Sequence, residues 1–249
     1  AWILTGANMG GKSALMRAVG QTILLAQMGS YVCATKAQLP IFTSILCRMG
    51  SSDQLLENNS TFMSEMHETR DIVDSKDLST SLVLVDELGR GTSSYDGVAV
   101  ASSTLSYLIH SRCCFIFVTH FSSLCEPYVN NDSCAAVQCK YMSFVIEENL
   151  RNSSTCSGVR SDDEKAVHDD DGDAAGGGRS INSSSRRLRF LFRAVDGVSP
   201  SSFGVEVAAQ ANISASVRAL ACVKSAEMER REAIGVLNKF LRRPAHTIK

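Results

Sequence analysis

A glycine-rich loop near the start of the chain has the composition of a phosphate-binding site. It matches the pattern G-x-x-x-x-G-K-[ST] and consists of Gly6, Ala7, Asn8, Met9, Gly10, Gly11, Lys12 and Ser13. Glycines let backbone N–H groups turn inward around phosphate oxygens, and a helix that begins at the end of the loop adds positive potential. In such a loop Lys12 reaches the β- and γ-phosphates of a nucleotide, and the Ser13 hydroxyl can bind Mg²⁺. A glycine turn without function is the alternative, and the flanking strand and helix patterns argue against it.

Two carboxylates follow an apolar run further along the chain. Residues 82–85 are all apolar and lead directly into Asp86 and Glu87. Open α/β sheets place ligand residues at the carboxyl ends of their strands, so we expect this pair beside the phosphate-binding loop. There Asp86 would hold Mg²⁺, directly or through water, and Glu87 would polarise an attacking water. An acidic pair that only caps a strand on the surface is the alternative.

A histidine ends the next apolar run. Thr119 and His120 follow the segment 115–118. The carboxyl end of a parallel strand would bring His120 to the same edge as the acidic pair. His120 can then sense the γ-phosphate, but a lone histidine at a strand end is usually structural, and both interpretations stay open.

These residues require an α/β fold to position them. The first 147 residues alternate short apolar strands, expected at 2–5, 44–48, 81–85 and 115–119, with helical segments. Two amphipathic helices are expected from residues that recur at helical spacing: Leu15, Ala18, Val19, Thr22, Ile23 and Ala26 in one, and Val98, Ala101, Leu105, Leu108 and Ile109 in the other. The pattern predicts a largely parallel sheet with helices packed on it.

The composition is that of a globular protein. The 249 residues are 44% hydrophobic, and 25 basic against 26 acidic residues leave no polycationic field to draw the whole chain onto nucleic acid. No apolar run reaches the roughly 18 residues that span a bilayer, so a membrane protein is excluded. The nine cysteines show no Cys-x-x-Cys spacing, which indicates neither a zinc site nor disulfides and is typical of a reducing compartment. Because the chain begins without Met and enters the loop at once, we expect a piece of a longer protein.

A break in composition follows the first 147 residues. Residues 148–186 are rich in Ser, Asp and Gly, with acidic residues crowded at Asp162, Asp163, Glu164, Asp169, Asp170, Asp171 and Asp173. We expect a disordered insert at the tip of a β-hairpin, because the flanking segments 139–147 and 188–195 are both strand-like. A docking tag for another protein is the less favoured interpretation.

The last part of the chain is expected to be helical. Residues 203–211 form one short amphipathic segment, and a longer helix begins near Ser214, which can cap it. This outline is that of a helix-turn-helix. The pair lacks the basic face of a DNA reader, so packing against protein is favoured.

Four motifs in the chain occur together in one known family. They are the loop 6–13, the block Ser60-Thr61-Phe62-Met63, the run Asp86-Glu87-Leu88-Gly89-Arg90-Gly91-Thr92-Ser93, and Thr119-His120. Together they resemble the ATPase domain of the MutS DNA mismatch-repair proteins. The resemblance covers nearly the whole chain outside the insert, and it is specific because generic P-loop enzymes do not share the second and third motifs.

The resemblance implies an ABC-type ATPase that works only as a dimer. Lys12, Ser13, Asp86, Glu87 and His120 would act on the ATP and Mg²⁺ of their own subunit, with Asn8 close to the phosphates. Ser60 and Thr61 are similar to the signature element that reaches the nucleotide of the partner subunit. The helices from Phe203 onward resemble the dimerisation helix-turn-helix of the family.

Within the family, Phe62-Met63 and the long insert most resemble the eukaryotic subunit specialised for insertion/deletion loops. The resemblance then implies a nuclear protein that pairs with another MutS homologue as a heterodimer. Domains upstream of these residues would contact mismatched or looped double-stranded DNA, and a MutL-type repair factor would act downstream.

We therefore expect an ATPase core in 1–147, the insert in 148–186, a returning strand and turn in 187–202, and dimerisation helices in 203–249. ATP hydrolysis at a composite dimer site would drive the DNA-clamp cycle. One alternative is a weakly hydrolysing ATP switch in a meiotic recombination clamp, although no missing catalytic residue favours it. A second is a small-molecule kinase, against which the block at Ser60 argues.

Overall fold

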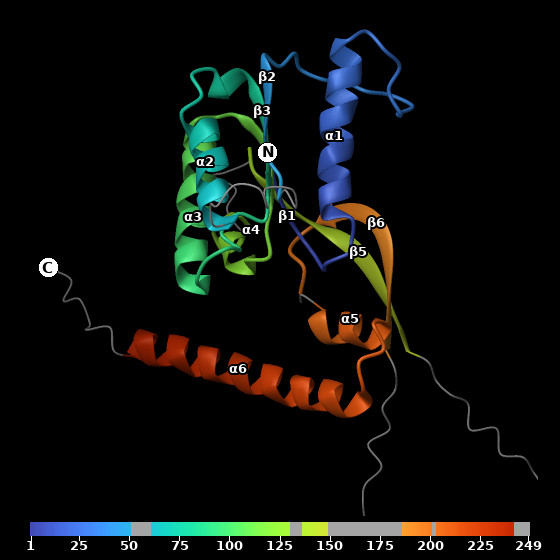
Figure 1. Ribbon diagram of the computed structural model, residues 1–249, viewed down its shortest axis with the longest axis vertical. Helices are drawn as coiled ribbons and strands as arrows, with labels where there is room; N and C mark the ends of the chain where they lie inside the picture. The colour runs from blue at the N-terminus through green and yellow to red at the C-terminus, as the bar shows by residue number, and fades with distance from the viewer. Residues whose placement is uncertain (51–60, 130–135, 149–185, 201–202, 242–249) are drawn as a thin grey trace, which may run out of the picture. The chain divides into compact units, whose positions relative to one another are not determined.

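The computed structural model describes residues 1–50, 61–129, 136–148, 186–200 and 203–241. Its elements are β1 (Trp2–Thr5), α1 (Lys12–Gln27), β2 (Ser44–Arg48), α2 (Thr61–Val73), η1 (Leu78–Thr80), β3 (Ser81–Asp86), α3 (Ser94–His110), β4 (Cys114–Val118), η2 (Ser122–Leu124), α4 (Glu126–Val129), β5 (Gln138–Glu148), β6 (Arg186–Asp196), α5 (Gly204–Gln210) and α6 (Ala215–Leu241), where η marks a 3₁₀ turn (Figure 1). They divide into two compact units, residues 1–145 with 189–207 and residues 146–188 with 208–249.

The first unit is built on a parallel sheet, as the sequence predicts. The six strands lie in the order β2-β3-β4-β1-β5-β6, and every pairing from β2 through to β5 is parallel. Residues Leu4, Val118 and Asp86 occupy one row across β1, β4 and β3. The carboxyl ends of these three strands therefore meet at one edge of the sheet.

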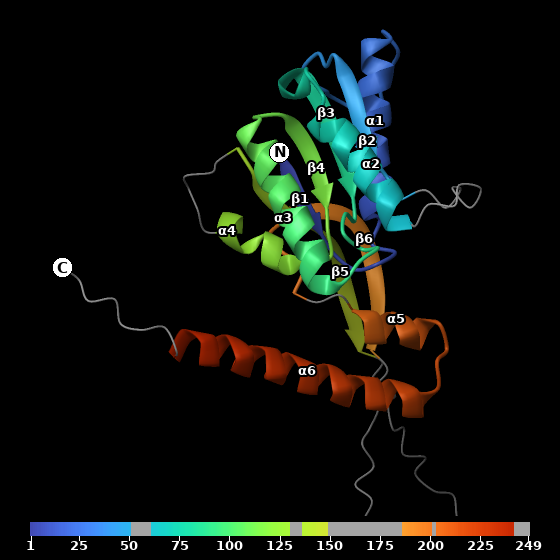
Figure 2. The same ribbon diagram turned by 60° about the vertical axis from the view of Figure 1, so that its left-hand side comes forward.

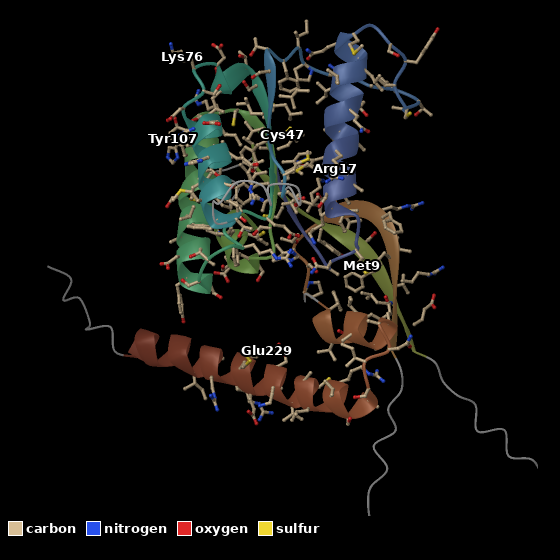
Figure 3. All side chains as sticks on the ribbon, viewed as in Figure 1. Met9, Arg17, Cys47, Lys76, Tyr107 and Glu229 are labelled. Carbon is tan, nitrogen blue, oxygen red and sulfur yellow. The ribbon has the colours of Figure 1, made fainter. Side chains whose placement is uncertain are left out.

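The core lies on both faces of this sheet, because successive side chains of a strand point to opposite sides. Val83 and Val85 of β3 pack with Leu105 of α3 in one buried cluster. Leu82 and Leu84 pack in the other cluster, which includes Met16 and Ile23 of α1. Figures 1 and 2 show α1 on one side of the strands and α2 with α3 on the other, and Figure 3 shows the side chains that fill both spaces.

Two details of the helices differ from the sequence predictions. Leu15, Val19 and Ile23 of the predicted face of α1 pack in the core, but Met16 is buried beside them and Ala18 is exposed, and the helix lies against the sheet at Gly20. A Cβ at Gly20 would lie 3.0 Å from Leu84 Cδ1. The second difference is α2, which the sequence analysis had not predicted as a helix, and which begins at Thr61 immediately after the signature block residue Ser60.

The hairpin around the insert is present, with strands longer than expected. Gly197 N–H donates a 2.9 Å hydrogen bond to Cys139 O, so the start of β5 lies beside the end of β6. The strands reach Glu148 and begin again at Arg186. The insert between them, which the sequence predicts to be disordered, lies outside the described residues.

The helices α5 and α6 occupy the segments for which helical periodicity was predicted. Exposed apolar side chains fall on one broad side of α6: Val217, Leu220, Val223, Met228 and Ile234. Their assignment as a dimerisation helix-turn-helix stays a prediction. Within the described part of the chain, no helix combines the length and the apolar character that crossing a membrane requires.

Two glycines let the segment 86–91 at the end of β3, the acidic turn, pack closely against α3. Gly89 has a φ of +90°, and a Cβ built on Gly97 would lie 2.2 Å from Gly89 O. Ser93 caps α3 by accepting a hydrogen bond from the N–H of Asp96. The acidic turn thus packs against the first turn of α3 through backbone atoms, because neither glycine has a side chain.

We predict that Gly97→Ala lowers the free energy of unfolding by about 1–3 kcal/mol, because its methyl group overlaps the Gly89 carbonyl. Alanine is the better helix former, so only this overlap can produce the loss. The measurement is the midpoint of urea unfolding, with Gly204→Ala as the control, since a Cβ there meets no atom within 4 Å. Equal midpoints for the two variants would contradict the close packing.

Candidate functional site

The loop after β1 has the backbone geometry of a phosphate cradle. Gly6 and Gly11 have φ values of +134° and +92°, and Met9 is also left-handed at +67°. Gly10 N–H donates to Ala7 O at 3.1 Å and closes the turn. No side chain caps α1 at Gly11, so the positive end of the helix faces the loop.

The ammonium group of Lys12 is buried inside this loop. Lys12 Nζ donates to Gly6 O at 2.8 Å and to Ala7 O at 3.0 Å, and its side chain is only 4% exposed. Burial lowers the pKa of Lys12, against the opposing attraction of Glu87 and Asp86. The hydrogen bonds of this buried cation go to neutral carbonyls of its own loop, and the carboxylate of Glu87 is 3.8 Å away, so an anion bound within the loop would be favoured.

Backbone hydrogen bonds hold the three strand ends together. Thr119 N–H donates to Leu4 O, and Glu87 N–H donates to Val118 O, each at 3.0 Å. The phosphate loop, the acidic pair and His120 are therefore brought to one place, although they lie far apart in the sequence.

Glu87 is at the centre of this arrangement. Its Oε1 lies 2.5 Å from His120 Nε2 and 3.8 Å from Lys12 Nζ, and its Oε2 accepts a 2.8 Å hydrogen bond from Arg90 Nη1. The hydrogen bond from His120, aided by the positive charges, lowers the pKa of Glu87 to about 2, although burial acts in the opposite direction. Glu87 also has a φ of +51°, which is unusual for a residue with a side chain.

Asp86 presents a carboxylate oxygen suited to a cation. Its Oδ1 is buried and makes no hydrogen bond to any described residue. Magnesium prefers oxygen ligands and usually binds one or two protein groups together with phosphates and water. Asp86 Oδ1 and the hydroxyl of Ser13, in the first turn of α1, are therefore groups that fit Mg²⁺.

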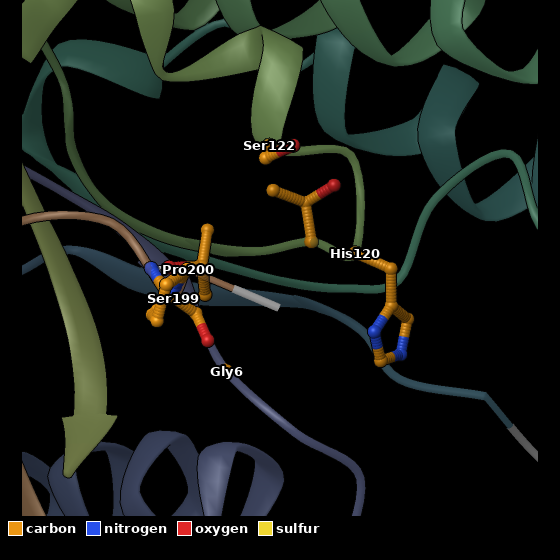
Figure 4. Close-up of a pocket in the computed structure, with 7 residues that line it drawn as sticks. Gly6, His120, Ser122, Ser199 and Pro200 are labelled. Atoms are coloured by element: carbon orange, nitrogen blue, oxygen red, sulfur yellow. Dashed lines mark hydrogen bonds between the residues drawn. The ribbon is translucent and has the colours of Figure 1, made fainter. Parts of the chain in front are cut away.

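A polar pocket of about 230 Å³ adjoins the loop on the side of β4 (Figure 4). It is lined by Thr5, Gly6, Thr119, His120, Ser122, Ser199 and Pro200. Ser199 N–H donates to Thr5 Oγ1 at 3.0 Å, so the segment after β6 is attached to the end of β1. His120 consequently has Glu87 on one side and a hydroxyl-lined space on the other.

Several residues at the site were not assigned a role by the sequence analysis. Arg90 pairs with Glu87, and its position three residues further on is the signal that was available. Arg48 is buried at the end of β2, where a charged residue that ends an apolar strand was the signal. Phe192 of β6 has a φ of +54° and is 65% exposed, and a Cβ on Gly11 would lie 2.9 Å from its ring.

The predicted site residues are thus distributed as follows. Lys12, Glu87 and His120 meet directly, and Asp86 ends the strand beside them. Asn8 and Met9 lie exposed at the tip of the loop. Ser60 falls outside the described residues, so its role stays a prediction.

Comparison with known proteins identifies the family. The model of MutS domain V matches residues 2–162, which is more than half of the chain. The chain belongs to the MutS family. The predicted resemblance is confirmed.

The chain is also similar to several fungal proteins named DNA mismatch repair protein MSH3. It is 40% identical over 230 residues to that of Chaetomium globosum and 37% identical over 230 residues to that of Botryotinia fuckeliana, in each case covering 92% of this chain. It is 49% identical over 119 residues, or 48% of this chain, to that of Yarrowia lipolytica. The aligned region spans only 18%, 18% and 12% of these relatives.

The lowered pKa of Glu87 predicts a pH dependence of stability. Its folded-state pKa is about 2 against an ordinary value of 4.5, so its stabilisation is complete above about pH 5 and is lost as the pH falls toward 2. When the pH is lowered from 6 to 4, this group alone should reduce the free energy of unfolding by about 1 kcal/mol. Glu87→Gln should remove that part of the loss, as measured by urea unfolding at both pH values.

The exposed carboxylate of Glu126 supplies the matched control. Glu126→Gln should keep the pH dependence of the unsubstituted protein. If Glu87→Gln kept it as well, the ion pairs around Glu87 would not stabilise the fold.

Proposed function

We propose that this chain is the ATPase domain of a MutS-type mismatch-repair protein and hydrolyses ATP with Mg²⁺. The observation that carries the proposal is the position of Glu87. Its carboxylate stays charged at the edge of the sheet, between the phosphate-loop lysine and His120. A charged carboxylate beside a phosphate cradle can accept or orient the hydrogens of an attacking water.

The loop residues would bind the triphosphate. Backbone N–H groups of the loop other than that of Gly10, together with the N-terminal end of α1, would offer donors to the β- and γ-phosphates. Lys12 Nζ would exchange its bonds to Gly6 O and Ala7 O for phosphate oxygens, which replaces neutral acceptors by charged ones. The exposed ring of Phe192 beside Gly11 offers an apolar face for the base.

Asp86 and Ser13 would hold the metal ion. A Mg²⁺ ion held there would supply positive charge that offsets the negative charge developing on the phosphate in the transition state. The unpaired, buried Asp86 Oδ1 supports this assignment. The bond from Arg48 to the backbone carbonyl of Asp86 fixes the residue that carries this oxygen.

Glu87 would position the water for in-line attack, and His120 would hold Glu87. The 2.5 Å contact to His120 Nε2 and the bond from Arg90 fix the carboxylate in one orientation. His120 also lines the pocket beside Gly6, so its ring is close to where the γ-phosphate would lie. In this proposal the histidine would have a function beyond packing.

The site would be completed by a second subunit in the manner of ABC ATPases. The block 60–63, whose last three residues form the start of α2, would reach the nucleotide of the partner, and the exposed apolar side of α6 would contribute to the dimer. The partner would be another MutS homologue, because the chain resembles MSH3 proteins of eukaryotes. Hydrolysis would then depend on dimer formation.

The rest of the protein would supply the DNA contacts. The chain spans a small part of the length of its relatives, so domains beyond it would bind mismatched or looped double-stranded DNA. A MutL-type factor would act downstream, and the nucleus is the expected location. The relatives named for mismatch repair do not favour a weakly hydrolysing meiotic switch, and membership in the MutS family leaves the small-molecule kinase without support.

The proposal is tested by steady-state ATP hydrolysis of the full-length protein with its candidate partner, with and without looped DNA. Glu87→Gln should slow hydrolysis by about 100-fold or more while ATP binding changes little, since the amide fills the same space but cannot act as a base. Lys12→Ala should abolish binding itself. Glu126→Gln, a change of the same type on the surface, should match the unsubstituted protein.

Unchanged turnover in Glu87→Gln would remove Glu87 from the catalytic role. ATP binding without turnover in the complete dimer on DNA would replace the hydrolase by a nucleotide switch.

The metal assignment has its own test. Asp86→Asn should raise the Mg²⁺ concentration needed for half-maximal hydrolysis by about tenfold or more, because a charged ligand becomes neutral. The measurement is a Mg²⁺ titration at saturating ATP, again beside Glu126→Gln. An unshifted titration would exclude Asp86 as a ligand.

A further inference from the structure

The beginning of α2 is attached to the turn that carries Asp86 and Glu87. Glu65 Oε2 accepts a 3.3 Å hydrogen bond from Gly89 N–H. A Cβ on Gly91 would lie 3.1–3.3 Å from the backbone and Cβ of Phe62, so the turn packs closely against the first turn of the helix. Neither contact involves the sheet hydrogen bonds that hold β3.

Arg48 also contacts both α2 and the end of β3. It is 3% exposed at the end of β2, and its Nη1 donates to the backbone carbonyl of Asp86. Its Nη2 lies 2.8 Å from Glu65 Oε1. One guanidinium therefore contacts the metal-site strand end with one nitrogen and α2 with the other.

Glu68 supplies a second carboxylate near Arg48, and its contact with Arg48 is weaker than that of Glu65. Glu68 Oε2 lies 3.7 Å from Arg48 Nε, which is too long for a hydrogen bond, and its side chain is 30% exposed. Glu65 is 12% exposed and bonds to both Arg48 and the turn. The link between helix and turn thus depends on Glu65, which has the hydrogen bond to Gly89, and Glu68 lies one helical turn further along.

We propose that Arg48 and Glu65 are positioning residues that make α2 and the Asp86–Gly91 turn move as one body, and so couple the two ATP sites of the dimer. The inference rests on the proposed function, in which the N-terminal end of α2 faces the nucleotide of the partner. ATP held at the partner site fixes α2, and the buried pair transmits this to the turn that positions Asp86 and Glu87. Hydrolysis at this subunit's own site is then faster when the partner site is loaded.

The physical basis is the cost of separating a buried ion pair. If α2 moved without the turn, Arg48 or Glu65 would lose its partner inside the fold, and Gly89 N–H would lose its acceptor. Moving the two elements together avoids that cost. A pair that served packing alone would have no effect on how one site responds to the other.

The test uses full-length heterodimers with two altered partners. One partner binds ATP but cannot hydrolyse it, and the other cannot bind ATP, so all turnover arises from this subunit. The readout is the ratio of kcat with the loaded partner to kcat with the empty one. The unsubstituted protein should give about fivefold or more, the usual lower range for coupled sites.

Glu65→Ala should bring this ratio close to one with KM for ATP changed less than about twofold, as expected for lost coupling without lost binding. Glu68→Ala, on the same helix, should keep the full ratio. Urea unfolding establishes that each variant folds. If Glu65→Ala does not fold, Glu65→Gln takes its place. This variant should give at most half of the ratio of the unsubstituted protein, because it lacks the charge that pairs with Arg48.

The outcomes separate the two proposals. A full ratio in the folded Glu65 variants, or a ratio near one in the unsubstituted protein that still hydrolyses ATP, overturns the coupling and leaves the ATPase assignment standing. Equal loss of the ratio in Glu68→Ala also overturns it, since the effect would not follow the bond to the turn. Absence of hydrolysis in the unsubstituted dimer on DNA overturns the proposed function, and the coupling with it.

Discussion

A carboxylate that stays charged while mostly enclosed by protein sets the arrangement of the site. Only 18% of the Glu87 side chain is exposed, and burial alone would favour its neutral form. His120, Lys12 and Arg90 offset this, and each comes from a different segment: the end of β4, the start of α1 and the turn after β3. These groups can meet only if the strand ends are in register, which the bonds from Thr119 and Glu87 to neighbouring strands ensure.

Backbone contacts extend this constraint into the helices on one face of the sheet. Gly89 meets Gly97 at the start of α3, and Gly91 meets Phe62 at the start of α2. The absence of side chains at these glycines lets the acidic turn touch both helices at once. The turn is therefore fixed by the sheet on one side and by two helix ends on the other, which is how a short loop can hold a carboxylate in a single orientation.

Asp86 differs from Glu87 in its contacts. Around Glu87 every charge has a partner, whereas Asp86 keeps one buried oxygen without a hydrogen bond in the described structure. Arg48, which has the charge to pair with that oxygen, bonds instead to the backbone carbonyl of Asp86 and to Glu65. The two neighbouring carboxylates thereby differ in their surroundings: the oxygens of Glu87 are paired and held in place, whereas Asp86 Oδ1 has no hydrogen-bond partner among the described residues.

The sequence by itself determined the parallel α/β core, the phosphate loop, the acidic pair and the family, because strand alternation and short motifs are local patterns. It also indicated the edge of the sheet where Lys12, Asp86, Glu87 and His120 gather. Only the tertiary structure decided that Arg48 and Glu65 join α2 to the turn, that Phe192 lies against the loop, and that α1 is buried along Met16. These features depend on distances between segments remote in the chain and on glycines that permit close approach, which no local spacing encodes.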